Sequence, residues 1–406
     1  MMSDTKVLPV SPSVSWIGVL DPGLVTFDVV METRYGTTYN SYFINAERKA
    51  VVETVKAKFR DTWLAKIRQL ADPASIEYLI MNHTEPDHSG NVGELLKLAP
   101  KAKVVGTGNA IRYLTDQLGF EFPHIVVKDG QTLDLGNMTL RFISAPNLHW
   151  PDTMYTWLED EQVLFTCDSF GEHFCREEMY DDLAGDFDDS FKYYFDVIMK
   201  PYSRFMVQAI EKIRPLDISV ICPGHGVILR SFWKKYVGLT EQYAREALKN
   251  PARNRVFVGY VSAYQNTGLI AEMIAEGLKK SGDLDVSLID IEKFDPVVVE
   301  QELIRSSGIL LGSPTFNQNI LMPVYQVFAL LNPIRDRGKL AAAFGSYGWS
   351  GEGAKIINSG LAALKMEVFD EGLMVRFTPH NEMASRCVEY GTAFGKRLLE
   401  KANETK

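Results

Sequence analysis

Cysteine is scarce in this sequence, and so is histidine. The 406 residues include four cysteines, Cys167, Cys175, Cys222 and Cys387, and no two of them form a C-x-x-C pair. This pattern excludes a cysteine-ligated zinc ribbon, a rubredoxin-type iron centre and a disulfide scaffold within the chain, and it favours a reducing cytoplasm. Histidine occurs seven times, and the positions of these residues prove the most informative feature of the chain.

Two further features are missing, a run of positive charge and a long apolar segment. The formal net charge is −9, with 43 Lys and Arg against 52 Asp and Glu, which does not favour nucleic acid as a partner. No apolar stretch approaches the ~20 residues needed to span a bilayer, and the first residues lack a secretory signal. We therefore expect a cytoplasmic protein that binds neither nucleic acid nor a membrane.

Length and composition indicate a globular chain of about two or three domains, because domains contain roughly 150 residues each. Hydrophobic residues make up 46% and charged residues 23%, which argues against disorder. From Val14 to about Gly226, short β-rich segments dominate, as is typical of an α/β sandwich of two sheets. Strands are expected at 39–44, 50–55, 76–81, 103–106, 138–144 and 162–166, with a helix at 58–70.

The second half has a different order of expected secondary-structure elements. A helix is expected at 231–248, and Pro251 in the segment 249–254 favours a linker. Strands and helices then alternate over about 150 residues, which predicts a doubly wound parallel sheet. Strands are expected at 255–261, 285–291, 308–312, 339–345 and 366–377, with helices at 267–278 and 381–402. The domains are therefore expected to span residues 1–251 and 252–406.

The segment from Tyr78 to Gly90 carries the strongest functional signal. An apolar strand leads into four potential metal ligands within six residues, namely His83, Glu85, Asp87 and His88. Ionisable side chains at such density cost stability unless something compensates their charge, and a metal ion is the simplest compensation.

One loop cannot surround a pair of metal ions, so we expect further ligands from later strand ends. Three residues meet this description, His149, Asp168 and His225. A lone histidine more often has a structural role, but four in such clusters favour ligation. His124, His173 and His380 fall outside the clusters and need no function. Cys167 adjoins Asp168 and is interpreted as a small buried filler.

The ligand loop resembles the H-x-H-x-D-H motif of the metallo-β-lactamase superfamily, with Glu85 in place of the second histidine. Imidazole suits zinc, whereas additional carboxylate suits harder, redox-active iron. The resulting H-x-E-x-D-H variant is similar to that of the flavodiiron proteins, or A-type flavoproteins. The resemblance implies one iron bound by His83, Glu85 and His149, a second bound by Asp87, His88 and His225, and Asp168 as the bridge between them.

Three loops in the second half predict a flavin site. Each follows a strand of the parallel sheet, and the first also precedes a helix, whose N-terminal N–H groups can bind phosphate without Lys or Arg. Taken alone, the first loop could equally be a plain capped turn between strand and helix. The residues expected at the site are Ser262, Ala263, Tyr264, Gln265, Asn266, Thr267, Pro314, Thr315, Phe316, Asn317, Asn319, Ser346, Tyr347, Gly348, Trp349, Ser350 and Gly351.

This half resembles flavodoxin, which implies FMN as the cofactor. Small, polar and aromatic residues at successive carboxyl ends of parallel strands suit an isoalloxazine ring at a topological switch point. The G-x-G-x-x-G fingerprint is absent from the first turn, which disfavours a nicotinamide site.

The resemblance to flavodiiron proteins covers essentially the whole chain and implies an oxidoreductase. Electrons from an external donor, such as rubredoxin or a reduced deazaflavin, would pass through FMN to two non-haem iron ions. The reaction would reduce dioxygen to water and/or nitric oxide to nitrous oxide. Relatives form head-to-tail dimers, so we expect a homodimer or a dimer of dimers, with Trp150 and Glu85 near the partner's flavin.

One segment departs from the family pattern. Residues 20–35 lack the Trp and His with which relatives cap the substrate pocket, and Phe27, Arg34 and Tyr35 are the candidate replacements. This segment leaves open which gas is preferred.

Two other functions remain open on the sequence. One is a zinc hydrolase of the metallo-β-lactamase type fused to a flavodoxin domain, and the other is a non-enzymatic FMN electron carrier. Glu85 argues against the first, and the complete ligand set argues against the second.

Overall fold

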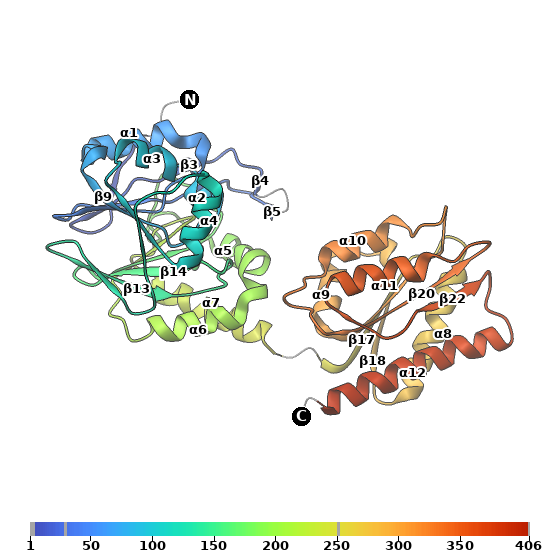
Figure 1. Ribbon diagram of the computed structural model, residues 1–406. Helices are drawn as coiled ribbons and strands as arrows, with labels where there is room; N and C mark the ends of the chain where they lie inside the picture. Colours follow the sequence, from blue (N-terminus) through green and yellow to red (C-terminus); the bar gives the residue numbers. More distant parts are fainter. Residues whose placement is uncertain (1–4, 28–30, 250–251, 405–406) are drawn as a thin grey trace. The chain divides into compact units, whose positions relative to one another are not determined.

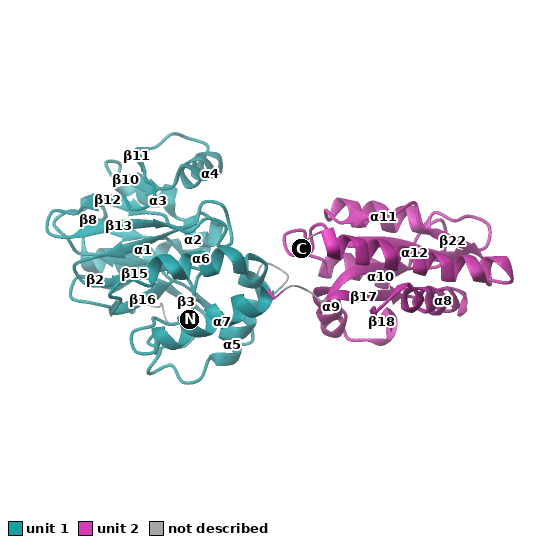
Figure 2. Ribbon diagram, turned by 90° about the horizontal axis from the view of Figure 1, so that it is seen from below, with its two compact units in different colours: residues 1–248 teal, residues 249–406 magenta. Residues whose placement is uncertain are grey.

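The computed structural model describes residues 5–27, 31–249 and 252–404, and the chain forms two compact units (Figures 1 and 2). Unit 1 spans Met1–Leu248 and unit 2 spans Lys249–Lys406. The expected boundary at residue 251 falls outside the described residues. Within the described part of the chain, no helix is both long and apolar enough to cross a membrane.

Unit 1 contains two stacked sheets with helices on their outer faces, which confirms the expected αββα sandwich. The first sheet has the order β1 (Leu8–Pro9), β2 (Val14–Trp16), β7 (Tyr42–Ile44), β8 (Lys49–Val52), β9 (Ile76–Ile80), β10 (Lys103–Gly106) and β11 (His124–Val126). The second has the order β12 (Thr132–Asp134), β13 (Thr139–Ser144), β14 (Met154–Leu158), β15 (Val163–Cys167) and β16 (Val220–Pro223).

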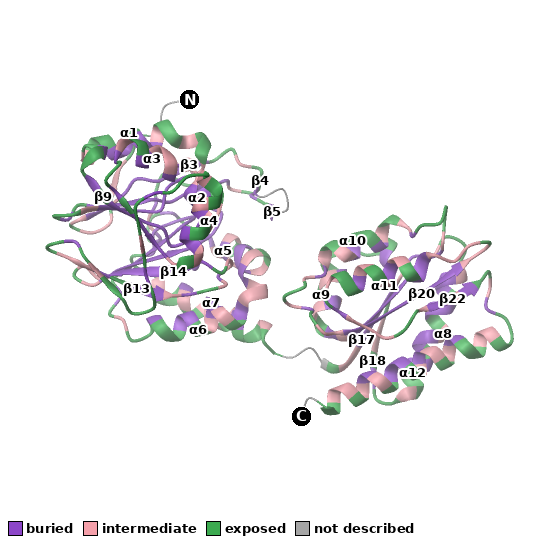
Figure 3. Ribbon diagram, viewed as in Figure 1, coloured by how far each residue is buried: buried purple, intermediate pink, exposed green. Residues whose placement is uncertain are grey.

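The core of unit 1 lies between these sheets and beneath the helices. Trp16 and Ile80 from one sheet pack in the same buried cluster as Phe142 and Phe165 from the other. Helices α1 (Arg60–Leu70) and α3 (Val92–Leu98) cover one outer side, and α6 (Ser203–Ile213) and α7 (Trp233–Ala247) cover the other (Figure 1). Figure 3 shows the strands largely buried and the outward faces of these helices exposed. Burial on both faces explains why the strands are continuous apolar runs.

Unit 2 is a doubly wound parallel sheet, as expected. Its strand order is β18 (Asp285–Asp290), β17 (Ala252–Tyr260), β19 (Ser306–Gly312), β20 (Leu340–Tyr347) and β21 (Glu367–Val368), and β22 (Leu373–Arg376) also pairs with β20. Helices α8 (Asn266–Ser281) and α12 (Glu382–Glu404) pack on one face, and α9 (Pro296–Arg305), α10 (Met322–Leu330) and α11 (Gly353–Ala363) pack on the other. The chain order reverses at β17, so the switch point lies between β17 and β19.

The structure corrects two expected strands. The segment 39–44 is not one strand, because β6 (Thr37–Tyr39) pairs with β3 (Val19–Asp21) while β7 joins the large sheet. The break occurs at Asn40, whose backbone N–H donates to Gly224 O at 2.8 Å. The segment 366–377 likewise divides into β21 and β22, because Gly372 adopts a left-handed turn with φ of 92°.

Several expected boundaries also differ, and two of them show why. The strand expected at 50–55 ends at Val52, because Glu53 has a positive φ of 58°. Strand β17 begins at Ala252, inside the segment expected to be a linker. Both differences concern ends of elements, which depend most on tertiary contacts.

Candidate functional site

The structure brings all seven residues expected as metal ligands together at one end of the two sheets of unit 1. The loop after β9, which includes the short helix α2 (Pro86–Ser89), supplies four of them. His149 follows β13, Asp168 follows β15, and His225 follows β16. Strand ends on a packed scaffold thus present every candidate ligand.

The first group of candidate ligands consists of His83, Glu85, His149 and one side of Asp168. Glu85 Oε2 lies 3.3 Å from His83 Nε2 and 3.0 Å from His149 Nε2. Asp168 Oδ2 lies 3.5 Å from His83 Nε2 and 3.6 Å from His149 Nε2. Two imidazole nitrogens and two carboxylates therefore converge on one point.

The second group consists of Asp87, His88 and His225. Asp87 Oδ2 lies 3.1 Å from His225 Nε2 and 3.5 Å from His88 Nε2. The other oxygen of Asp168, Oδ1, lies 3.1 Å from His88 Nε2 and 3.5 Å from His225 Nε2. Asp168 therefore directs one carboxylate oxygen to each group, which is the geometry of a carboxylate that bridges two metal ions.

Burial tests whether these residues fit a metal pair. Both carboxylate oxygens of Asp87 and of Asp168 are buried and accept no hydrogen bond from any described residue. A buried carboxylate without a hydrogen bond or a cation is costly. The donor set of imidazole and carboxylate suits two iron ions, so the residues fit a diiron centre.

The charges at the site keep the carboxylates ionised, which is the form that binds metal ions. Burial acts to raise the pKa of Asp168, but the neighbouring histidines, His88 foremost, hold it well below its ordinary value. Burial acts to lower the pKa of His88, but Asp87 and Asp168 raise it to about 10. Metal binding would therefore displace protons from the imidazoles while the carboxylates are already ionised.

Hydrogen bonds behind the ligands orient two of the imidazole rings. His83 Nδ1 lies 3.2 Å from Asp152 Oδ1, and Thr84 donates to Asp152 Oδ2 from both its backbone N–H and its hydroxyl. His225 Nδ1 donates to Thr38 O at 2.6 Å. These acceptors leave Nε2 of both rings for the metal. Asp152 is absent from the expected ligands, and its place three residues after His149 is the signal in the sequence for this role.

His173, for which no function was expected, lies beside the second ligand group. Its ring centroid is 5.1 Å from that of His225, 4.3 Å from that of Phe27 and 4.9 Å from that of Tyr194. Thr37 Oγ1 and His173 Nδ1 are 2.8 Å apart, and Nε2 is buried without a hydrogen-bond partner among the described residues. Only the packing of the two sheets brings it here.

The candidate capping residues divide into two kinds. Phe27 packs edge-on against the His225 ring, with 5.4 Å between centroids. Tyr35 instead packs edge-on against Phe174, and the Arg34 guanidinium lies over the Tyr35 ring. Phe27 is therefore the member of this set that contacts a candidate ligand.

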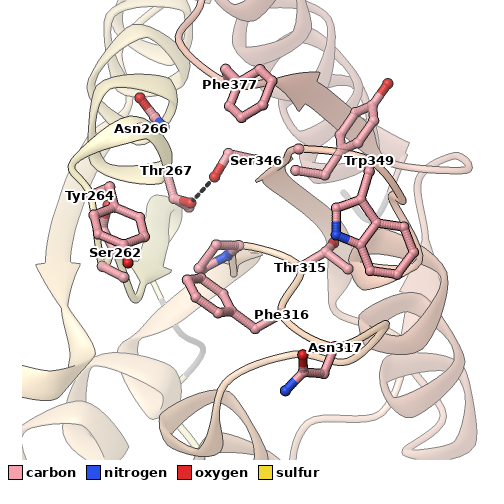
Figure 4. A pocket seen from close by; sticks show the side chains of 14 residues that line it. Ser262, Tyr264, Asn266, Thr267, Thr315, Phe316, Asn317, Ser346, Trp349 and Phe377 are labelled. Atoms are coloured by element: carbon pink, nitrogen blue, oxygen red, sulfur yellow. Dashed lines mark hydrogen bonds between the residues drawn. The ribbon is translucent and has the colours of Figure 1, made fainter.

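Unit 2 contains a cavity of about 250 Å³ at the carboxyl ends of β17, β19, β20 and β22 (Figure 4). Thirteen of the seventeen residues expected at the flavin site line it. The four that do not line it are Gln265, Asn319, Ser350 and Gly351. Phe377 lines the cavity although the sequence did not suggest it, and its position just after β22 was the available signal.

One end of the cavity suits a phosphate group. Gly268 N–H donates to Ser262 Oγ at 3.1 Å at the start of α8, and Thr267 Oγ1 lies 2.9 Å from Ser346 Oγ. No Lys or Arg lines the cavity among the described residues. A phosphate would therefore rely on hydroxyls and on the N–H groups of the helix N-terminus.

Aromatic side chains surround the remainder of the cavity, as Figure 4 shows. Tyr264 is 76% exposed and Trp349 is 75% exposed. Tyr264 and Phe316 are stacked, with 6.1 Å between ring centroids. Such exposed aromatic faces suit a planar heteroaromatic ring, so the cavity fits FMN.

The fold and the two sites define a two-domain protein with a β-lactamase-like metal centre and a flavodoxin-like flavin site. Family models support both halves, since residues 37–226 match the ODP family beta lactamase and residues 258–391 match flavodoxin. A type A flavoprotein from Rhodobacter capsulatus is 41% identical over 98% of this chain and 92% of its own length. The chain belongs to the family of type A flavoproteins, or flavodiiron proteins.

Other relatives and solved structures agree. A nitric oxide reductase from Moorella thermoacetica is 33% identical over 98% of this chain and 100% of its own length. The solved structure of rubredoxin oxygen:oxidoreductase from Desulfovibrio gigas is 27% identical, with a TM-score of 0.70 over 98% of this chain and 99% of that chain. The flavodiiron protein from Giardia intestinalis is 29% identical, with a TM-score of 0.67 over 98% of both chains.

Proposed function

We propose that this protein is an oxidoreductase that reduces dioxygen to water and/or nitric oxide to nitrous oxide. The observation that carries the proposal is Asp168, whose two oxygens face two separate ligand groups in a chain that also has a flavin cavity. The Desulfovibrio and Moorella relatives, named for oxygen and nitric oxide chemistry, support the same reaction class.

The proposed metal domain covers residues 1–251. His83, Glu85 and His149 would hold one iron, Asp87, His88 and His225 would hold the other, and Asp168 would be shared between them. A pair of irons would supply the redox chemistry for reduction of a gas. Burial of Asp87, His88 and Asp168 excludes water around the ligands. Phe27, His173 and Tyr194 form an aromatic wall beside His225.

The proposed flavin domain covers residues 252–406. Ser262, Asn266 and Thr267 hold the FMN phosphate, and the aromatic residues Tyr264, Phe316, Trp349 and Phe377 enclose the isoalloxazine. The seventeen residues expected from the sequence remain the proposed FMN set, with Phe377 added from the cavity lining.

Electrons are proposed to come from an external donor, either a separate rubredoxin or a reduced deazaflavin. We also propose a head-to-tail homodimer in which the flavin of one protomer approaches the irons of its partner, with Glu85 and Trp150 at that approach. The Trp150 ring lies 5.2 Å from the His83 ring, so it adjoins the first ligand group. The four cysteines are buried and include no C-x-x-C pair, which fits a reducing cytoplasm.

Cofactor content and gas kinetics test the proposal together. Purified protein is expected to contain two irons and one FMN per chain, and the fully reduced protein is expected to be reoxidised by dioxygen or nitric oxide in stopped-flow measurements. Zinc with hydrolase activity would overturn the proposal in favour of the zinc hydrolase, and FMN without metal would favour the electron carrier. Parallel rates for the two gases establish the preference.

A further inference from the structure

Glu53 is a buried carboxylate that the ligand assignment does not use. It follows β8 directly, it is 2% exposed, and its φ of 58° lies in the left-handed region. For a residue other than glycine, this backbone conformation is unfavourable. Burial of its carboxylate is a second cost unless both oxygens have partners.

One oxygen of Glu53 holds the start of the ligand loop. Its Oε1 accepts the backbone N–H of Asn82 at 2.6 Å and that of His83 at 3.3 Å. The other oxygen, Oε2, is buried and has no hydrogen-bond partner among the described residues. Glu53 therefore has one acceptor still available inside the metal domain.

His88 has ring nitrogens that lack a hydrogen-bond partner. Its Nε2 faces Asp168 Oδ1 at 3.1 Å, and both Nε2 and Nδ1 are buried without a hydrogen-bond partner in the described part of the chain. A ring nitrogen of His88, a carboxylate oxygen of Glu53 and Cys167 Sγ all lie within 4.8 Å of one another. Sulfur is a weak acceptor, so the carboxylate is the better partner for an imidazole N–H.

The other imidazoles show what His88 lacks. Nδ1 of His83 has the Asp152 carboxylate, and Nδ1 of His225 has Thr38 O. An imidazole that binds a metal through Nε2 nearly always donates its Nδ1–H to such an acceptor. Glu53 is placed to be this acceptor for His88.

We propose that Glu53 is a positioning residue of the second iron site. Its Oε1 fixes the first two amides of the ligand loop. Its Oε2 lies close enough to accept the Nδ1–H of His88 when the metal is bound, and this bond would direct Nε2 toward the metal. This inference rests on the proposed function, because it takes His88 as an iron ligand. Glu53 itself does not contact the iron.

The test compares Glu53→Gln with wild-type protein by iron content, FMN content and Mössbauer spectra after a challenge with a chelator. Glutamine keeps the volume of the side chain. If its Oε1 accepts the two amides, its NH₂ group faces the Nδ1–H of His88, and two donors then face each other without an acceptor. The affinity of the second site is expected to fall about 10–100-fold. Iron should decrease from two to one per chain while FMN is unchanged.

Two matched variants assign the effect. Asp152→Asn removes the acceptor behind His83 and is expected to release the first iron preferentially. Its Mössbauer spectrum should therefore retain the signal of the iron that Glu53→Gln loses. Glu172→Gln alters another fully buried glutamate, whose Oε1 accepts only Val227 N–H, and is expected to keep both irons. Glu53→Asp keeps the charge but has a shorter side chain, so an intermediate iron affinity is expected at the second site. If Glu53→Gln fails to fold, the Glu53→Asp variant tests the proposal in its place.

The outcomes separate the two proposals. Wild-type protein with fewer than two irons would overturn the proposed function itself. Wild-type protein with two irons, together with a Glu53→Gln variant that keeps both or loses both equally, would overturn only the positioning role. Titration of the metal-free variants with Co²⁺, followed by absorption, measures site affinity independently of catalytic turnover.

Discussion

Gly224 packs directly against the imidazole of His88. A Cβ placed on Gly224 would lie 2.7 Å from His88 Cε1 and 3.1 Å from the backbone carbonyl carbon of Cys167. Neither neighbour can move freely, because His88 is held in the ligand cluster and Cys167 belongs to β15. The glycine after β16 is therefore required by the metal site itself rather than by its own backbone conformation.

Gly224→Ala is accordingly expected to displace the His88 ring. The overpacking should cost about 1–3 kcal/mol of stability, and the affinity for the second iron should fall by about 10-fold or more. Iron analysis together with urea unfolding measures both effects. Gly238→Ala in α7 is the control, because nothing lies within 4 Å of its added Cβ, and it should bind iron normally with slightly higher stability. Normal iron content in Gly224→Ala would contradict the packing argument.

Asp168→Ala tests the bridge. Removal of a carboxylate shared by both ligand groups should lower the affinity for both irons, by more than about 100-fold, while the FMN absorption spectrum stays unchanged. His83→Ala removes a ligand of the first group and should also abolish gas reduction with the flavin retained. Metal analysis and visible spectra of the purified variants check these outcomes, and iron retained in Asp168→Ala would disprove its assignment as the bridge.

Ser262→Ala tests the phosphate end of the flavin cavity. The hydroxyl meets the first turn of α8 at Gly268, and a hydrogen bond to a charged group contributes about 1.5–3 kcal/mol. The dissociation constant for FMN should therefore rise roughly 10–100-fold. Fluorescence titration of the flavin-free protein measures it. Ser359→Ala is the control, because this hydroxyl lies in α11 outside the cavity lining and donates to Lys355 O, so the variant should bind FMN as the wild type does.

Asp336 should make the stability of unit 2 dependent on pH. Burial acts to raise the pKa of its carboxyl, but the hydrogen bond from Arg335 and the charge of Lys339 hold it below its ordinary value. Because the folded pKa is the lower one, this stabilisation is present above the unfolded pKa of about 3.9 and is lost as the pH falls through the folded value.

Asp336→Asn is thus expected to lower the unfolding free energy by about 1.5–3 kcal/mol at neutral pH, because Arg335 and Lys339, which are both partly buried, lose a charged hydrogen-bond partner. The difference from wild type should shrink below about pH 4. Urea unfolding across pH measures this, with Asp283→Asn as an exposed control. A difference that persists unchanged at low pH would show that the charge is not responsible.

The sequence was enough to single out candidate ligands that lie together and most of the loops that line the cavity of unit 2, because both depend on short segments. His83, Glu85, Asp87 and His88 share one loop directly after β9, and the period of the strands places each later candidate at a strand end. The same local rules predicted the alternating strands and helices of unit 2. They were wrong for 39–44, where the Asn40 amide binds Gly224, a residue far away in the chain.

The order of motifs along the chain was thus enough to indicate a metal domain, a flavin domain and the chemistry of both sites. Only the packing of the two sheets decides which oxygen of Asp168 faces which ligand group. The same packing places the acceptors behind His83 and His225. These contacts join residues such as His83 and Asp152, which are 69 positions apart. Their geometry depends on the packing of whole sheets, and a pattern within one segment carries no information about it.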